Sequence, residues 1–390
     1  MGKKYGAHIL PLQKLAIIWF FIFTKFVFNE NQLLAWIDSK ISLSAKKLQT
    51  IELQYNHLLD GILDGFNQLN SIKNKWATKL QNLGDYNSDI QLFLDKNQRQ
   101  QIEIVTVKDK LYPQSLLHLT DPPIVLYCQG NLELLNSGSG ITVVGSRNYS
   151  KYSEIILKRI LEPVCKQKIP VVSGLALGID GLAHKLAVEN DCPTIGVIGS
   201  GLDDDNFYPS SNLALKKKII ATGGLVISQF CLGTKANPYN FPSRNKILAS
   251  LTDLTWVVQA SLKSGSLITA NLAIELGKNL ATTPASILDV SFAGNIQLLK
   301  NGVSIITCSE DIFDLLGLQH LSKIDLQKAI KFDSEIQKLI YENLGFEAKN
   351  VEQITMATNL DFLAVTSTLS LLEMSGLVSS LGGNVWVRNG

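Results

Sequence analysis

The pattern of apolar and polar positions changes along the 390-residue chain and divides it into regions of different character. Over 1–100, apolar residues recur at helical spacing, as in LLAWIDSKISL and YNHLLDGILDGF, with few strand signals. We therefore expect a small helical domain there. From 102 to 140 the pattern changes to short β-rich runs, IEIVTV and PIVLYCQG, with a double proline that favours extended backbone before the second run.

Between 141 and 307, apolar runs alternate regularly with helical segments. The runs are ITVVG, PVVSG, TIGVIG, LVISQF, LTWVVQA, NLATT and VSIIT, and helices are expected near 151–168, from 179, and near 210–221, 243–251, 267–277 and 294–300. This alternation predicts an α/β fold, a Rossmann-like doubly wound parallel sheet with helices on both faces. The runs are apolar throughout, as burial on two sides requires. Ligands of such sheets bind at the carboxyl ends of the strands.

The chain from about 333 predicts three helices and a hairpin. The helical segments are SEIQKLIYENL, VEQITMAT and DFLAVTSTLSLLEMSGL, and the hairpin VSSLGGNVWVRN turns at Gly-Gly. This order is typical of a winged helix. We therefore predict a helical N-terminal domain at 1–100, a Rossmann-like core at 101–320 and a winged-helix-like domain at 330–390.

Composition and charge place the chain among folded proteins with a basic core. Hydrophobic residues make up 46% of the chain and charged residues 18%, which excludes a disordered protein. Residues 141–307 contain 16 Lys+Arg and 11 Asp+Glu, net +5, whereas 308–390 contain 6 and 11, net −5. A basic core suits a polyanion, and an acidic C-terminal part argues against a strong nucleic-acid contact there.

The cysteines and the N-terminal apolar segment indicate a cytoplasmic protein. The five cysteines are widely spaced, contain no C-x-x-C and fit a reducing compartment rather than a zinc site. The apolar segment LAIIWFFIFT at 15–24 is shorter than the roughly 20 residues of a membrane-spanning helix. It also lacks a signal-peptide cleavage site, so we expect a core helix and no membrane partner.

Glycine and polar clusters fall where the strands of the core are expected to end. They are GSRN (145–148), SGLALGID (173–180), GSGLDDD (199–205), NFPSRNK (240–246) and KSGSLITA (263–270). One such loop could be a tight turn that needs glycine for backbone reasons alone. Five on one sheet edge, with backbone N–H groups, hydroxyls and basic side chains, favour a phosphate site. The candidate residues are Gly145, Ser146, Arg147, Ser173, Gly174, Gly199, Phe241, Arg244, Asn245, Lys246, Ser264, Gly265 and Ser266.

The loops do not match the fingerprints of nucleotide-binding enzymes. GSRNYS is not G-x-G-x-x-G, and the chain has no Walker A motif. Asp180 and His184 could form a base and its orienting group, but without a nucleophile we favour a helix cap and a packed histidine. The consecutive Asp203, Asp204 and Asp205 cannot all face one ion, so we expect a solvated loop. The sequence therefore predicts no catalytic residue, no metal and no cofactor.

Six motifs in chain order resemble those of the DprA (Smf) family of DNA-processing proteins. They are DKLYPQSLLHLTDPPIVLYCQGN, VVGSRNYSKY, VVSGLALGIDGLAH, IGVIGSGLDDDNFYP, NFPSRNKILASL and KSGSLITANLAIELGK, over about 102–307. The resemblance implies a protein without a known reaction that binds single-stranded DNA and forms homodimers through the core. It also implies help in loading the RecA recombinase during natural transformation.

The same resemblance implies that Arg147, Arg244 and Lys246 hold the DNA backbone. The turn at Ser173 would accept a phosphate by its N–H groups, and Phe241 would stack on a base unless it is a core aromatic. The sequence departs from the family pattern at Ser243, Lys246 and Gln259, in TTPAS, and in the acidic run 203–205. That run would lower the local positive potential and weaken DNA binding.

Two other functions remain open. A nucleotide or phosphoribosyl hydrolase on a related Rossmann-like fold would need a catalytic carboxylate beside the anion site, and KSGSLITANLAIE lacks the double glycine of that class. A regulator that binds DNA through the winged helix is disfavoured, because DFLAVTSTLSLLEMSGL contains no Arg or Lys. The C-terminal part is therefore expected to pack or to bind protein.

Overall fold

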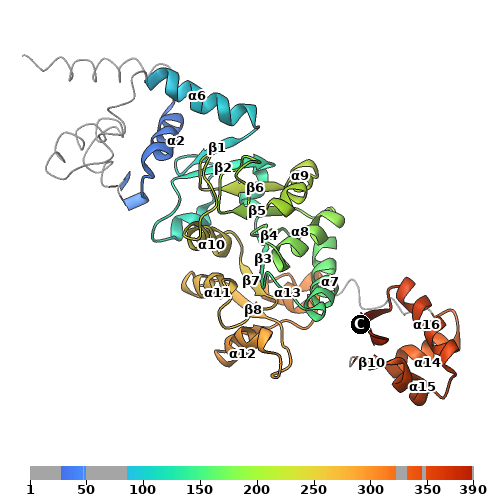
Figure 1. Cartoon of the computed structure of the whole chain (residues 1–390). Coiled ribbons are helices and arrows are strands. Elements are labelled where there is room, and N and C mark those ends of the chain that lie inside the picture. Colours follow the sequence, from blue (N-terminus) through green and yellow to red (C-terminus); the bar gives the residue numbers. More distant parts are fainter. Residues whose placement is uncertain (1–27, 47, 50–85, 322–331, 345–347, 389–390) are drawn as a thin grey trace, which may run out of the picture.

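A computed structural model describes residues 28–46, 48–49, 86–321, 332–344 and 348–388, and a nine-stranded sheet forms its centre (Figure 1). The strand order is β1-β2-β6-β5-β4-β3-β7-β8-β9. Neighbours from β6 to β9 pair in parallel, which confirms the Rossmann-like prediction. These strands are β3 (Ile141–Val144), β4 (Val171–Ser173), β5 (Thr194–Ile198), β6 (Leu225–Ser228), β7 (Leu254–Val257), β8 (Asn279–Thr282) and β9 (Ser304–Ile305).

The two β-rich runs before residue 141 extend this sheet beyond β6. They form β1 (Glu103–Thr106) and β2 (Val125–Gly130), and β2 pairs antiparallel with both β1 and β6. Strand β2 is buried on both faces of the sheet. Tyr127 packs in one apolar cluster and Cys128 in another. An antiparallel edge on a mostly parallel sheet is common in α/β proteins.

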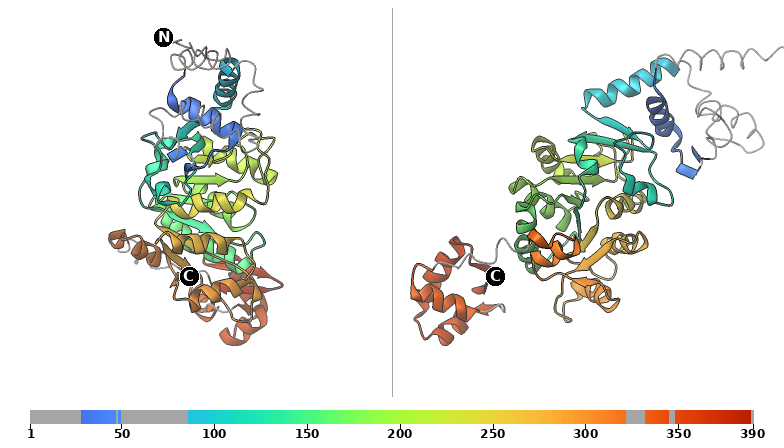
Figure 2. Two further views of the ribbon diagram at one scale, coloured as in Figure 1. Left: turned by 90° about the vertical axis from the view of Figure 1, so that its left-hand side faces the viewer. Right: turned by 180° about the vertical axis from the view of Figure 1, so that it is seen from behind.

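Helices cover both faces of the parallel strands, as two further views show (Figure 2). Side chains of α7, α8 and α13 contribute to the apolar core on one face, and those of α10, α11 and α12 to the core on the other. The bounds are α7 (Lys151–Lys166), α8 (Ile179–Glu189), α9 (Leu213–Ala221), α10 (Asn240–Leu251), α11 (Ser266–Glu275), α12 (Ala293–Lys300) and α13 (Ser309–Leu315). Short 3₁₀ segments are η2 (Gln114–His118), η3 (Leu132–Asn136), η4 (Ser210–Asn212), η5 (Val290–Phe292) and η6 (Gln319–Leu321).

Helix α10 begins earlier than the sequence pattern predicts. It starts at Asn240 rather than near 243, so Phe241 and Arg244 lie in its first two turns and not in a loop. Pro242 is compatible with this start, because first-turn residues have no N–H partner within the helix. The helix therefore presents the NFPSR motif in a fixed geometry at its amino end.

The described N-terminal residues form two helices that pack on the β1–β2 end of the sheet. Helix α2 (Glu30–Ile41) contains the predicted LLAWIDSKI segment, and α6 (Tyr86–Arg99) leads into β1. Leu34 and Trp36 of α2 share one apolar cluster with Tyr127 of β2. The predicted helix at 15–24 and the YNHLLDGILDGF segment lie outside the described residues. In the ranges that are described, no helix combines the length and apolarity needed to span a membrane.

The C-terminal residues form the predicted winged helix with a separate core. Its helices are α14 (Glu335–Leu344), α15 (Val351–Thr358) and α16 (Phe362–Met374), and its strands are β10 (Lys349–Asn350), β11 (Val378–Gly382) and β12 (Val385–Arg388). The sheet order is β10-β12-β11, and β11 and β12 form the predicted hairpin. Ile340, Ile354 and Leu369 pack together between the three helices.

Candidate functional site

A small pocket lies at the carboxyl ends of β3, β4 and β5, beside the amino end of α10. It is the edge at which the sequence predicted a phosphate site, and the loops that follow the three strands and the first turns of α10 all contribute to it. Ligands of doubly wound sheets bind at this edge. The lining residues are Arg147, Gly174, Ala176, Leu177, Gly199, Tyr208, Pro209, Phe241 and Arg244.

Arg244 brings a buried guanidinium to this pocket with most of its donors unused. Its side chain is 6% exposed, and Nη1 lies 4.0 Å from Oδ2 of Asp180, the length of a weak ion pair. Within the described part of the chain, its buried Nε–H has no hydrogen-bond partner. Burial lowers the pKa of Arg244 and Asp180 raises it, but a guanidinium stays protonated in proteins. Buried polar groups are almost always paired, so this donor set is suited to an anion.

Gly174 makes room for the pair of Arg244 and Asp180. A Cβ atom on Gly174 would lie 1.8 Å from Nη1 of Arg244 and 2.5 Å from Oδ2 of Asp180. The Gly174 N–H donates to that same oxygen at 3.1 Å. Burial raises the pKa of Asp180, and Arg244 and the Gly174 N–H act in the opposite direction. The glycine is therefore needed because Arg244 packs directly on the backbone of this turn.

The structure corrects two expectations about the same turn. The Gly174 N–H is taken by Asp180 and is not offered to a phosphate, and the Ser173 hydroxyl is buried and donates to the Val143 carbonyl at 2.6 Å. Asp180 does not cap α8 either, because the residue before the helix is Gly178. The Ser173 hydroxyl and the Gly174 N–H are therefore used within the protein, while Ala176 and Leu177 of the same turn line the pocket.

Phe241 lies close to both arginines of the pocket. The Cζ atoms of Arg147 and Arg244 are 5.5 Å and 5.9 Å from its ring centre, within cation–π range. The ring of Tyr208 lies 6.3 Å away at 62°, an edge-on contact. A Cβ on Gly199 would be 3.3 Å from the Phe241 ring, so this glycine leaves space for it. Phe241 is half-buried at the pocket and is not a core aromatic.

The remaining candidates surround or support the pocket without lining it. A Cβ on Gly145 would meet the Ile179 side chain at 2.7 Å, so this glycine allows α8 to approach β3. Ser146 donates to the Asn148 carbonyl and shapes the turn that carries Arg147. Further along α10, Asn245 donates to the Gly265 carbonyl at 3.5 Å. The hydroxyls of Ser264 and Ser266 bond to each other at 2.7 Å, and Lys246 is half-buried on α10.

Sequence reasoning missed Ala176, Leu177, Tyr208 and Pro209, which complete the lining. Of these four, Tyr208 could most easily have been identified from the sequence. It belongs to the quoted motif GLDDDNFYP, and an aromatic residue at the end of a loop that follows a core strand often marks a binding surface. It is 47% exposed, so its ring is accessible to a ligand at the pocket.

His184 and the acidic run have structural surroundings. His184 is fully buried, with Nδ1 2.8 Å from the Thr194 hydroxyl, and burial lowers its pKa to about 4. It is not part of the pocket lining, so the expectation of a packed histidine fits its position. Asp203, expected in a solvated loop, is instead buried. Among the described residues, no group of three His, Cys, Asp or Glu could hold a metal ion.

Fold and pocket together define a Rossmann-like core, with an arginine-lined pocket at the carboxyl ends of its strands, joined to a winged helix. A family model described as DNA recombination-mediator protein A matches residues 103–317, and a DprA winged helix domain model matches 328–384. These matches show that the chain belongs to the DNA recombination-mediator protein A family, the DprA/Smf proteins.

Individual relatives agree with this assignment. The chain is 37% identical over 217 residues to DNA processing protein DprA of Bacillus subtilis, covering 56% of this chain and 72% of the relative. It is 32% identical over 292 residues to protein Smf of Escherichia coli, covering 73% and 77%. The X-ray structure of DprA from Streptococcus pneumoniae superposes with a TM-score of 0.60 at 29% identity, over 73% of this chain and 98% of that one.

Proposed function

We propose that this DNA-processing protein of recombination binds single-stranded DNA by its sugar–phosphate backbone in the pocket of Arg147 and Arg244. The observation that carries the proposal is the pair of guanidinium groups, Arg147 and Arg244, that line the pocket beside Phe241. Phosphate oxygens supply the acceptors that such donors need. Phe241 and Tyr208 beside it offer rings to an unstacked base, which single strands present and duplexes do not.

We propose that the pocket binds without turnover. In the described lining of the pocket there is no carboxylate, and the nearby Asp180 is engaged by Gly174 and Arg244. A nucleotide or phosphoribosyl hydrolase would need such a group free beside the anion. His184 is buried, so it is not placed to act as a base on a substrate. Incubation with nucleotides is expected to release no base and no phosphate.

Arg147→Ala tests the site by its dependence on salt. If about four phosphates are neutralised, the slope of log K against log salt is near −3 on single strands, and affinity falls roughly 50-fold between 50 and 200 mM. Removing Arg147 should weaken binding by about 1–3 kcal/mol and flatten the slope by about 0.7. The loss should be equal on all base sequences, because phosphate contacts carry no sequence information.

Fluorescence anisotropy with a labelled single-stranded oligonucleotide measures both quantities. Lys158→Ala is the matched control, because this cation lies on α7 and outside the pocket lining. A folded Arg147→Ala protein with unaltered affinity and slope would mean that DNA does not bind in this pocket. Binding that is equally tight to duplex DNA would argue against the single-strand part of the proposal.

We propose that the core also forms a homodimer, and an exposed apolar loop supports this. Ile287, Leu288 and Val290 in the connection after β8 are each more than 80% exposed, at 82%, 88% and 82%. Apolar side chains exposed side by side in this way mark interaction sites. A second copy of the same surface is the partner that a twofold interface needs.

Leu288→Glu is expected to convert the dimer to a monomer, because it places a charge in the proposed interface. Light scattering at micromolar concentration measures the mass in solution. Leu371→Glu on α16, where the side chain is 52% exposed, is the control and should leave the dimer intact. If Leu288→Glu remains dimeric, the interface lies elsewhere.

The other parts of the chain complete the proposal. We propose that 1–100 forms a helical domain packed on the 101–320 core, that 330–390 acts as a separate domain, that the core binds DNA in the cytoplasm and that it helps to load the RecA recombinase. Family membership supports the recombinase as the partner. Helix α16 contains no Arg or Lys and exposes Leu363 and Met374, which supports contact with protein rather than DNA. Stimulation of RecA assembly on single strands is the assay for this step.

A further inference from the structure

The loop between β5 and α9 buries one of its three acidic residues, Asp203. It runs over 199–209 and brings Tyr208 and Pro209 to the pocket. Asp203 in this loop is 8% exposed, and its Oδ1 accepts the Gly233 N–H at 2.8 Å while its other oxygen accepts the Asn206 amide. A buried carboxylate with hydrogen bonds to both oxygens serves as an internal brace.

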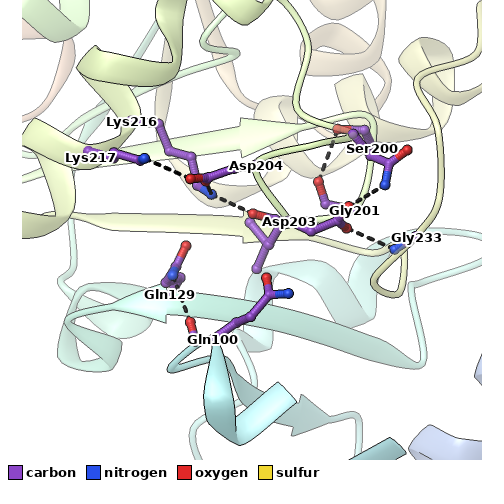
Figure 3. Close-up of polar contacts among 11 residues, drawn as sticks. Gln100, Gln129, Ser200, Gly201, Asp203, Asp204, Lys216, Lys217 and Gly233 are labelled. Carbon is purple, nitrogen blue, oxygen red and sulfur yellow. Dashed lines mark hydrogen bonds and ion pairs between the residues drawn. The ribbon is translucent and has the colours of Figure 1, made fainter. Parts of the chain in front are cut away.

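Asp203 joins this loop to the segment that leads into α10. Gly201 donates its N–H to the Thr234 carbonyl at 2.8 Å, next to the Asp203–Gly233 bond (Figure 3). At the end of that segment the Asn240 amide donates to the Gly199 carbonyl at 3.0 Å. Hydrogen bonds therefore join the loop that carries Tyr208 to the segment that leads to Phe241.

Lys216 forms hydrogen bonds to the same loop from helix α9. Its side chain extends from α9, is 2% exposed, and donates to the Leu202 carbonyl and to Oδ1 of Asp204 at 3.1 Å (Figure 3). Lys217 contacts the other oxygen of Asp204 at 2.7 Å. Two ammonium groups thus contact Asp204, which remains 45% exposed, and Asp205 is exposed with no described partner.

We propose that Asp203 and Lys216 are positioning residues of the DNA site, which fix the β5–α9 loop so that Tyr208 faces Phe241. The proposal rests on the function proposed above, because it concerns the same pocket. It also reverses the sequence-based expectation for the acidic run. Asp203 is buried as a hydrogen-bond acceptor and Asp204 is paired with two lysines, so these two carboxylates support the loop instead of repelling the DNA backbone.

The two interpretations of Asp203 predict opposite changes in the affinity for single-stranded DNA. If it braces the loop, Asp203→Ala weakens binding of a labelled single strand by about tenfold, because a buried N–H loses its acceptor. Asp203→Asn then stays within about twofold of wild type, because its amide oxygen still accepts from Gly233 and a flipped Asn206 amide can accept from its NH2 group. If the acidic run repels DNA, both variants bind more tightly and to the same extent. Lys216→Met removes the donor from the Leu202 carbonyl, so it should weaken binding about as much as Asp203→Ala.

A double-mutant cycle with Tyr208→Ala separates positioning from general damage to the fold. If Asp203 acts through the loop that holds Tyr208, Asp203→Ala adds less than about twofold in the Tyr208→Ala background. The salt slope should stay at the wild-type value, because no phosphate contact is removed. Asp205→Asn, on the exposed side of the loop, is the control and should change affinity less than twofold.

The outcomes distinguish this proposal from the one on which it rests. Weakening by Arg147→Ala, together with wild-type or tighter binding by Asp203→Ala, would overturn the positioning role and leave the DNA site in place. No effect of Arg147→Ala would overturn the site itself. Full additivity of Asp203→Ala and Tyr208→Ala would also contradict the positioning role, since the two residues would then act independently.

Discussion

Arg244→Ala is expected to remove DNA binding and to destabilise the core at the same time. The variant takes away a buried guanidinium that a phosphate would pair with, so affinity for single strands should fall by about 3 kcal/mol. It also removes the cation paired with the buried carboxylate of Asp180 and leaves only the weaker influence of Arg147. Removing one partner of a buried ion pair costs about 3–5 kcal/mol of unfolding free energy. The 4.0 Å separation of this pair places the expected loss near the lower value.

The double variant Asp180→Asn, Arg244→Ala separates the two effects. It removes the unpaired charge, so urea unfolding should show that most of the lost stability returns. DNA binding should not return, because no guanidinium is restored. Arg244→Lys keeps a charge without the planar fork and should bind DNA more weakly than wild type. Recovery of DNA affinity in the double variant would show that Arg244 acts only through stability.

The parallel sheet could be predicted because each strand is short, apolar throughout and followed by a helix. The spacing of apolar residues changes where a strand gives way to a helix, and this change can be read from neighbouring residues alone. It predicted the seven parallel strands correctly. The antiparallel position of β1 and β2 could not be predicted in the same way. It depends on which edge of the sheet the preceding chain reaches, and no local pattern encodes that choice.

The sequence could predict the location of the site, because its residues follow the ends of the core strands, but not the direction of each side chain. Arg147, Phe241 and Arg244 were found because the loops of a doubly wound sheet converge on one edge. Ser173 lies at the same edge, but its hydroxyl points into the sheet, and the direction of a side chain at the last residue of a strand depends on register. The contact of Gly174 with Arg244 joins residues 70 positions apart and arises from helix packing alone.

The acidic run at 203–205 shows a different limit of prediction from the sequence. In the sequence, Asp203, Asp204 and Asp205 are three adjacent charges, and a net-charge argument counts them equally. In the structure, Asp203 is buried with two hydrogen bonds, Asp204 is exposed but paired with two lysines, and Asp205 is exposed without a described partner. Charge counts predict long-range potential, but burial and pairing decide which charges remain to act on a ligand.

His184 should make the stability of the core depend on pH below neutrality. It is fully buried near Arg244, and burial, with a smaller contribution from Arg244, lowers its pKa from 6.5 to about 4. Below pH 6.5 the unfolded chain binds a proton that the folded chain does not, so the free energy of unfolding falls as the pH decreases. The difference of about 2.5 pKa units corresponds to about 3 kcal/mol, all of it lost by pH 4.

Urea unfolding of wild type and His184→Gln at pH 7 and pH 4.5 measures this contribution. Glutamine is polar and does not titrate, so the variant should lose about 2–3 kcal/mol less than wild type between these two values. Burial also raises the pKa of Asp180, which acts in the opposite direction, but this term is common to both proteins and cancels in the comparison. DNA affinity at pH 7 should stay within a few-fold of wild type, because His184 does not line the pocket. An equal loss of stability in both proteins would show that His184 accepts its proton in the folded state, and a lost hydrolase activity in a folded variant would return it to the role of a catalytic base.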